Sequence, residues 1–154
     1  MRVFLDTNVL VSAFASRGLC ADLLELVLLE HDLVVGRNVL NELRKALRDK
    51  IKLIAARSSE IVEFVAGEAV AVIEEAEAAV ASVDTADARV LGEARAGRVQ
   101  LFVTGDAALL KLATIEGLAI VSPRQFWEAL KAGRKWRSAT ARRLPSQVVL
   151  QTGR

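Results

Sequence analysis

Two short apolar runs of this sequence end at aspartates. Residues 2–5 (RVFL) lead directly into Asp6, and residues 99–103 (VQLFV) lead through a two-residue turn to Asp106. Runs of this kind predict strands, and ligands of open α/β sheets bind outside the carboxyl ends of strands, where the strand order reverses. If the two strands are neighbours, we expect both carboxylates at one edge of the sheet. Glu42 and Asp87, each on an expected helix, can reach the same edge.

Carboxylates gathered in one place define the chemistry that this edge can support. They repel each other, so the pKa of each is raised unless a cation neutralises it. Oxygen ligands with no His or Cys nearby favour Mg²⁺ or Mn²⁺ over zinc. Such ions lower the pKa of bound water and stabilise the leaving oxygen of a phosphodiester. The pattern therefore predicts a metal-assisted nuclease site.

Three of the acids also have simpler structural explanations. Asp106 precedes an apolar helical segment, and taken alone it is best explained as an N-cap, a common role of Asp. Asp84 and Asp87 could both be capping and helix-dipole residues of a single helix. Asp6 is the hardest to explain in this way, because a charge at the end of a buried strand is costly unless it is paired or bound to a metal.

The remaining candidates have alternatives that the sequence leaves open. Glu42 lies at the border of an apolar helix face, where it can point along the sheet edge, but it could also pair with Lys45 or Lys50 on a solvated surface. Asn8 and Thr104 can orient the acids or their waters, and turn formation explains them equally well.

The composition excludes several other kinds of catalyst. With one cysteine, Cys20, no disulfide can form within the chain, and with one histidine, His31, a zinc site of Cys and His ligands is excluded. There is no tyrosine, so acid–base or nucleophilic chemistry must depend on carboxylates, Lys, Ser or Thr, or on a metal that they hold. No glycine-rich nucleotide loop or hydrolase Ser motif is present.

Strand and helix patterns alternate along the chain. This alternation predicts one α/β domain with a mainly parallel central sheet. The expected strands are 2–5, 33–35, 99–103 and 118–121, and the expected helices are 9–14, 19–30, 38–48, a long one from Ser58 or Ser59 to 79, 84–96, 107–116 and 123–132.

Charge divides the 154 residues into two parts. Residues 1–130 carry 14 Lys or Arg against 19 Asp or Glu, a net charge of −5, whereas residues 131–154 carry seven basic residues and no acid. We therefore expect a domain over residues 1–132 followed by a basic tail over 133–154. An acidic body with a basic tail suits a polyanion held against a cation-filled site, and a solvated tail without a partner is the alternative. No secretory signal or membrane-spanning run is found, so a cytoplasmic location is expected.

Together these motifs resemble the PIN domain, specifically the VapC-like nuclease toxins of toxin–antitoxin pairs. The resemblance spans residues 1 to about 130 and depends on the order and spacing of four motifs. It implies a single-domain three-layer α/β/α sandwich with a short, mainly parallel sheet, an acidic Mg²⁺ or Mn²⁺ site and endoribonuclease activity. In many members it also implies a homodimer and a cognate antitoxin. The motifs are VFLDTNVL at 3–10, EL at 42–43, DTAD at 84–87 leading to VL at 90–91, and VTGD at 103–106 with LL at 109–110.

The resemblance also implies a role for each site residue. Acidic ligand positions fall on Asp6, Glu42, Asp87 and Asp106, with polar support from Asn8 and Thr104. Asp87 precedes the apolar helix residues as the family's third acid does, whereas Asp84 takes the capping position. Many relatives carry a further acid in this stretch, but Ala86 interrupts it here, so a fifth ligand is not expected.

Three functional hypotheses follow. The leading one is a metal-dependent endoribonuclease in which Asp6 and Asp106 hold the metal, while Glu42 and Asp87 complete its shell or act through water. A second is an aspartyl-phosphate phosphotransferase with Asp6 as nucleophile; such enzymes are expected to have a second acid where this chain has Asn8. A third is a non-catalytic module of the same fold that binds RNA or assembles with a partner. In the first hypothesis, basic residues near the C-terminus bind RNA phosphates: Lys131, Arg134, Lys135, Arg137, Arg142 and Arg143.

Overall fold

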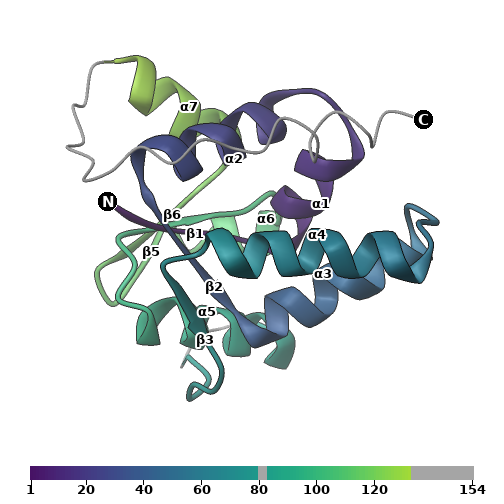
Figure 1. Ribbon diagram of the computed structural model, residues 1–154. Coiled ribbons are helices and arrows are strands. Elements are labelled where there is room, and N and C mark those ends of the chain that lie inside the picture. Colours follow the sequence, from purple (N-terminus) through teal and green to yellow (C-terminus); the bar gives the residue numbers. More distant parts are fainter. Residues whose placement is uncertain (80–82, 133–154) are drawn as a thin grey trace.

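One mixed sheet forms the centre of the fold, which the computed structural model describes for residues 1–79 and 83–132 (Figure 1). Within these residues the strand order is β3-β2-β1-β4-β6-β5, and all neighbouring strands are parallel except β5 and β6. The expected mainly parallel sheet is therefore confirmed. The strands are β1 (Arg2–Leu5), β2 (Asp32–Gly36), β3 (Ala71–Ile73), β4 (Leu101–Val103), β5 (Thr114–Ile115) and β6 (Leu118–Val121).

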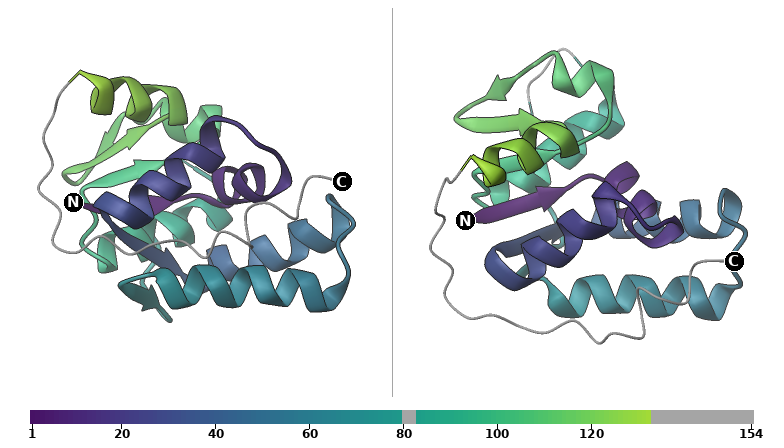
Figure 2. Two further views of the ribbon diagram at one scale, coloured as in Figure 1. Left: turned by 45° about the horizontal axis from the view of Figure 1, so that its top comes forward. Right: turned by 90° about the horizontal axis from the view of Figure 1, so that it is seen from above.

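Helices cover both faces of this sheet, as a three-layer sandwich requires. Figures 1 and 2 show α2 and α7 over one face and α5 against the opposite face. None of the helices in the described part of the chain is long and apolar enough to cross a membrane. The helices are α1 (Thr7–Ala15), α2 (Leu19–Glu30), α3 (Arg37–Asp49), α4 (Ala55–Glu68), α5 (Thr85–Ala96), α6 (Ala107–Leu110) and α7 (Pro123–Lys131).

The interior strand β1 is buried on both of its faces. Val3, Phe4 and Leu5 have no exposed surface, and the Phe4 ring stacks on Phe102 of β4 with ring centroids 5.3 Å apart. A strand covered on both faces is a continuous apolar run rather than an alternating one. The run ends at Asp6, so the chain leaves the core with a charged residue at the carboxyl edge of the sheet.

The expected long helix from Ser58 or Ser59 to residue 79 is wrong in its extent. Helix α4 begins at Ala55 and ends at Glu68, and the chain then forms β3, which pairs with β2. The Val70 amide donates a hydrogen bond to the Leu33 carbonyl at 2.8 Å before the strand begins. Apolar residues in this region satisfy a helical spacing, but edge pairing with β2 is a tertiary contact that overrides local periodicity.

The expected helix over 107–116 is also wrong, because only its first turn forms. Helix α6 ends at Leu110, and the chain continues into the β5–β6 hairpin. The two residues between these strands, Glu116 and Gly117, have φ of 47° and 84°. Positive φ at both central residues is typical of a tight type I′ hairpin turn, in which glycine is favoured. The other expected elements are found with their ends within two residues of the expected ones.

Candidate functional site

The strands that end near Asp6 and Asp106 are neighbours, as the site hypothesis requires. Strand β1 pairs in parallel with β4, with Leu5 opposite Val103, and the Asp6 amide donates to the Val103 carbonyl at 2.9 Å. Both strands therefore end at the same edge of the sheet. Asp6 follows β1 as the N-cap of α1, and Asp106 follows β4 as the N-cap of α6.

Asp6 is fixed in place by hydrogen bonds to both carboxylate oxygens. Its Oδ1 accepts from the Thr7 amide at 2.8 Å, and its Oδ2 accepts from the Thr104 hydroxyl at 2.7 Å and from Asn8 Nδ2 at 3.3 Å. Asn8 Oδ1 in turn accepts from the Gly105 amide at 2.9 Å. Asn8 and Thr104 therefore contact the carboxylate that they were expected to support, and both also stabilise the turn after β4.

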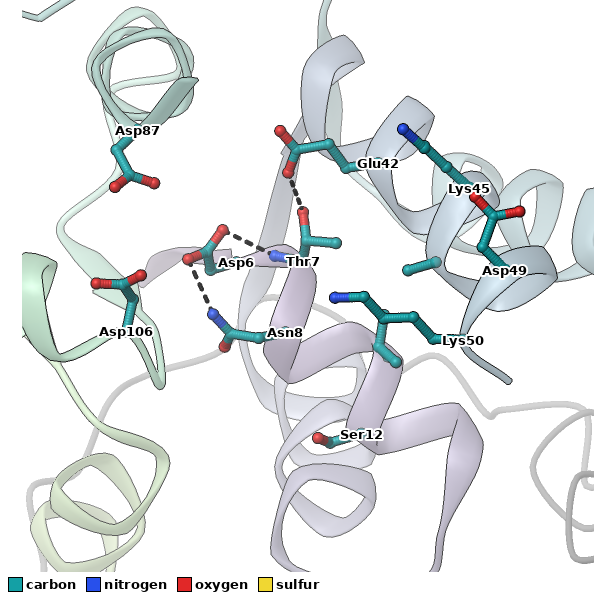
Figure 3. Close-up of a pocket in the computed structure, with 12 residues that line it drawn as sticks. Asp6, Thr7, Asn8, Ser12, Glu42, Lys45, Asp49, Lys50, Asp87 and Asp106 are labelled. Atoms are coloured by element: carbon teal, nitrogen blue, oxygen red, sulfur yellow. Dashed lines mark hydrogen bonds between the residues drawn. The ribbon is translucent and has the colours of Figure 1, made fainter. Parts of the chain in front are cut away.

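Asp106 combines a cap with an oxygen that remains free to bind a ligand. Its Oδ1 accepts from the amides of Ala108 and Leu109 at 2.8 and 3.2 Å, and its own amide donates to the Thr104 hydroxyl at 3.0 Å. In the described part of the chain its Oδ2 makes no hydrogen bond. The capping explanation is therefore correct, and the Asp106 side chain also lines the pocket (Figure 3).

The other two acids come from helices. Asp84 is the N-cap of α5 and accepts from the Asp87 amide at 2.8 Å, whereas the Asp87 side chain lines the pocket. Glu42 of α3 accepts a hydrogen bond from the Thr7 hydroxyl at 2.9 Å. Among the described residues it forms no ion pair with a lysine. The structure therefore gives Asp84 and Asp87 the different positions that the resemblance implied for them.

All four candidate acids line one pocket of about 560 Å³ at the carboxyl edge of the sheet (Figure 3). Asp6, Glu42, Asp87 and Asp106 come from four different elements or their ends, and Figure 3 shows their carboxylates around a shared space. The pocket extends away from them between α1 and α3. Its other lining residues are Thr7, Asn8, Val11 and Ser12 of α1, and Lys45, Ala46, Asp49 and Lys50 at or beside α3.

Burial and mutual repulsion raise the pKa of two of these acids, Asp6 and Asp87. Burial raises the pKa of Asp6, which is 7% exposed; hydrogen bonds from Thr104 and Thr7 oppose the rise, and the charges of Glu42 and Asp106 add to it. Burial also raises the pKa of Asp87 to about 6, with added repulsion from Asp84 and the other three site acids. The raised pKa values show that both carboxylates are harder to ionise than usual. A cation bound between them would favour their ionised forms, so the pocket suits a bound cation.

The donor set fits a hydrated, hard divalent cation. Within residues 1–79 and 83–132, no group of three or more His, Cys, Asp or Glu side chains is arranged to hold one ion. Mg²⁺ does not need such a group, because it is usually bound through one or two carboxylates and keeps several waters. Asp6 and Asp106, at the ends of neighbouring strands, can supply that number of direct ligands.

Glu93 is a polar residue of this region that the sequence did not reveal. It lies on α5 and is only 1% exposed, and its Oε1 accepts from the amide and from the side-chain Nδ2 of Asn38, both at 2.7 Å. Gly36, the N-cap of α3, has no side chain to cap the helix, so Glu93 does so from another helix. Burial raises the Glu93 pKa, the Asn38 bonds and the Val39 amide lower it, and Glu42 adds repulsion.

The expected RNA-binding residues near the C-terminus do not line this pocket where the structure describes them. Lys131 is the last residue of α7, and its Nζ lies 5.3 Å from the centre of the Trp127 ring. The remaining residues of that set lie outside the described part of the chain: Arg134, Lys135, Arg137, Arg142 and Arg143.

A mainly parallel sheet covered by helices on both faces, with an acid-lined pocket at its carboxyl edge, defines an α/β domain. Residues 2–108 match the family model described as PIN domain, so the chain belongs to the PIN domain family. The solved structures include a similar one, the "Crystal structure of VapBC2 from Rickettsia felis bound to a DNA fragment from their promoter". The similarity to it has a TM-score of 0.57 at 15% sequence identity and covers 79% of this chain and 98% of that one. No curated protein matches this chain.

Proposed function

We propose that this PIN domain is an Mg²⁺- or Mn²⁺-dependent endoribonuclease that hydrolyses RNA phosphodiester bonds. The observation that carries the proposal is that Asp6, Glu42, Asp87 and Asp106, from separate parts of the chain, line one pocket at the carboxyl edge of the sheet. Four acids facing one space are costly to ionise together unless a cation is bound among them. A ligand site at this edge agrees with the general position of ligand sites in open α/β sheets.

In this proposal the four acids have two different roles. Asp6 and Asp106 hold the metal directly, and Glu42 and Asp87 complete its shell or act through water. When bound, the ion would lower the pKa of a water and stabilise the leaving oxygen of the phosphodiester. The pKa of Asp87 is raised to about 6 in the metal-free site, and a bound cation would favour its ionised form. Thr104 and Asn8 act on Asp6 and fix the orientation of its carboxylate.

The residue at position 8 argues against the phosphotransferase hypothesis. Such enzymes are expected to have a second acid where this chain has Asn8. The Asn8 side-chain Nδ2 donates to Asp6 Oδ2 at 3.3 Å, so an amide and not a second carboxylate lies beside Asp6.

We further propose that the chain is the toxin of a toxin–antitoxin pair, acting in the cytoplasm as a homodimer with a cognate antitoxin protein. Support comes from the VapC-like order of its four motifs and from the similarity of its fold to the VapBC2 structure. In this proposal residues 1–132 form the nuclease domain, and the basic segment 133–154 adds phosphate contacts.

Cleavage of a mixed pool of single-stranded and structured RNAs tests the activity. Purified protein is incubated with Mg²⁺, Mn²⁺ or EDTA beside an Asp6→Asn/Asp106→Asn variant. A Glu63→Gln/Glu128→Gln variant is the charge-matched control, because both of these glutamates are exposed and away from the pocket. We expect cleavage only with metal, its loss in the aspartate variant and its retention in the control. A folded wild type that binds RNA but cuts nothing, and whose metal binding is the same in the aspartate variant, would instead support the non-catalytic module.

A further inference from the structure

One wall of the pocket is a stripe along α3 and its C-cap that includes two lysines and two acids. Glu42, Lys45, Ala46, Asp49 and Lys50 all line the pocket. Their spacing of three, four, seven and eight residues from Glu42 places them on one face of the helix. At about 1.5 Å of rise per residue, the stripe extends about 12 Å from Glu42 to Lys50. The pocket therefore continues from the carboxylates along the helix, past two ammonium groups.

Lys45 and Lys50 are available to bind an anion. In the described part of the chain, neither side chain forms a hydrogen bond or an ion pair, whereas Arg37, Arg57 and Arg95 each pair with a glutamate. Figure 3 shows the Lys50 side chain directed into the space between α3 and α1. A lysine at a helix C-terminus is favourable to the helix dipole, which accounts for Lys50 but not for Lys45, one turn earlier.

The opposite wall has no charge of its own. The α1 residues that line the pocket are all uncharged, so both lysines of the pocket lie on the α3 side; these α1 residues are Thr7, Asn8, Val11 and Ser12. Asp49, between the two lysines, is the only acid of the stripe beyond Glu42 among the described residues. An elongated polyanion entering the pocket would therefore be held along α3.

We propose that Lys45 and Lys50 bind phosphates of the RNA strand beside the bond that is cut. The proposal deepens the nuclease function and depends on it. With the cleaved phosphate at the carboxylates, Lys45 lies about 4.5 Å and Lys50 about 12 Å further along the helix axis from Glu42. We therefore place them at the phosphates that follow the reacting one along the strand. The site thus recognises a strand of several nucleotides, and Asp49 weakens the binding.

Salt-dependent binding tests this placement. Affinity for a fluorescent single-stranded RNA is measured by anisotropy with Mg²⁺ over a range of NaCl concentrations, in the Asp6→Asn/Asp106→Asn background so that the RNA stays intact. Each phosphate contact to a single strand adds about 0.7 to the slope of log affinity against log salt. Adding Lys45→Gln and Lys50→Gln should reduce the slope by about 1.4. Adding Asp49→Asn should strengthen binding.

The matched control is Arg44→Gln/Arg48→Gln, which removes the same charge from the same helix on exposed residues that do not line the pocket. We expect this control to change the slope much less than the lysine pair. Equal slopes for the two pairs would overturn the lysine site. If the protein with intact acids cleaves RNA but the Lys45→Gln/Lys50→Gln substitutions leave the salt slope unchanged, the lysine site is wrong and the nuclease function is retained. If the protein with intact acids neither cleaves nor binds RNA, the lysine site and the nuclease function are both wrong.

Discussion

The buried carboxylate of Glu93 caps a helix to which it does not belong. Its Oε1 accepts two hydrogen bonds of 2.7 Å from Asn38, one from the amide in the first turn of α3 and one from the side chain. Its Oε2 is buried and has no hydrogen-bond partner among residues 1–79 and 83–132. Glu93 therefore fixes the position of the start of α3. Because Glu42 follows one turn after Asn38, Glu93 also fixes the position of one wall of the pocket.

Close packing at this cap predicts that Gly36→Ala destabilises the protein. A Cβ at Gly36 would collide with the Glu93 carboxylate, and overpacking of this kind costs about 1–3 kcal/mol. In a Glu93→Ala background most of the collision is gone, so the same substitution should cost less. Urea unfolding followed by circular dichroism measures both changes. Gly67→Ala, on α4 with open space around it, is the control and should be neutral or stabilising. Strictly additive effects of Gly36→Ala and Glu93→Ala would contradict this account.

Thr104 should matter to metal binding more than to folding. Its hydroxyl donates to Asp6 Oδ2 at 2.7 Å and accepts from the Asp106 amide at 3.0 Å, so it orients both proposed metal-binding acids. Loss of such a supporting contact typically weakens metal binding by about 10–100-fold. Thr104→Val keeps the shape, and calorimetric titration with Mn²⁺ measures the affinity. Thr114→Val, on exposed β5, is the control. An unchanged affinity in a folded Thr104→Val protein would show that the hydroxyl only stabilises the turn.

The central part of the site was predictable because its signals are local. Asp6 follows a continuous apolar run and begins helix α1 as its N-cap, and the second aspartate, Asp106, follows strand β4 and begins α6 in the same way. Their convergence required only that β1 and β4 be neighbours. The capping role of Asp84 was also visible, because the residue it caps is three positions away.

The rest depends on contacts between distant parts of the chain. Glu93 looks like a solvated helical residue until α5 packs on Gly36 and Asn38, which are more than 50 positions away. The apolar spacing of β3 is compatible with both a helix and a strand, so the sequence alone predicts a helix there. Pairing with β2 stabilises the strand instead. Lys45 and Lys50 were expected only as partners of Glu42; the pocket between α1 and α3 gives them a different environment.

Asp87 should destabilise the metal-free protein at neutral pH. Its pKa is about 6 in the folded state against 3.8 ordinarily, so the folded state binds this proton more tightly than the unfolded chain does. The contribution of this proton to the free energy of unfolding is fully present below about pH 3.8 and is lost as the pH rises through about 6. Asp87→Asn removes the ionisation and should raise stability at pH 7 by on the order of 1 kcal/mol after solvent screening, or about 3 °C in Tm. Thermal melts in EDTA at pH 5 and pH 7 measure this, and Asp84→Ala, which removes the N-cap of α5, should lower Tm instead. A Tm of Asp87→Asn equal to that of the wild type at pH 7 would contradict the assigned repulsion.

Added Mg²⁺ should reverse that pH trend. A ligand that binds only the folded state stabilises it by about 2.7 kcal/mol at a concentration 100-fold above Kd. Binding needs ionised carboxylates, and burial raises the pKa of both Asp6 and Asp87, so protons compete with the metal as the pH falls toward 5. We therefore expect the Tm increase caused by Mg²⁺ to be larger at pH 7.5 than at pH 5.5, and to be absent in Asp6→Asn/Asp106→Asn. Glu63→Gln/Glu128→Gln should keep the full increase. A pH-independent increase that survives in the aspartate variant would place the ion outside this pocket.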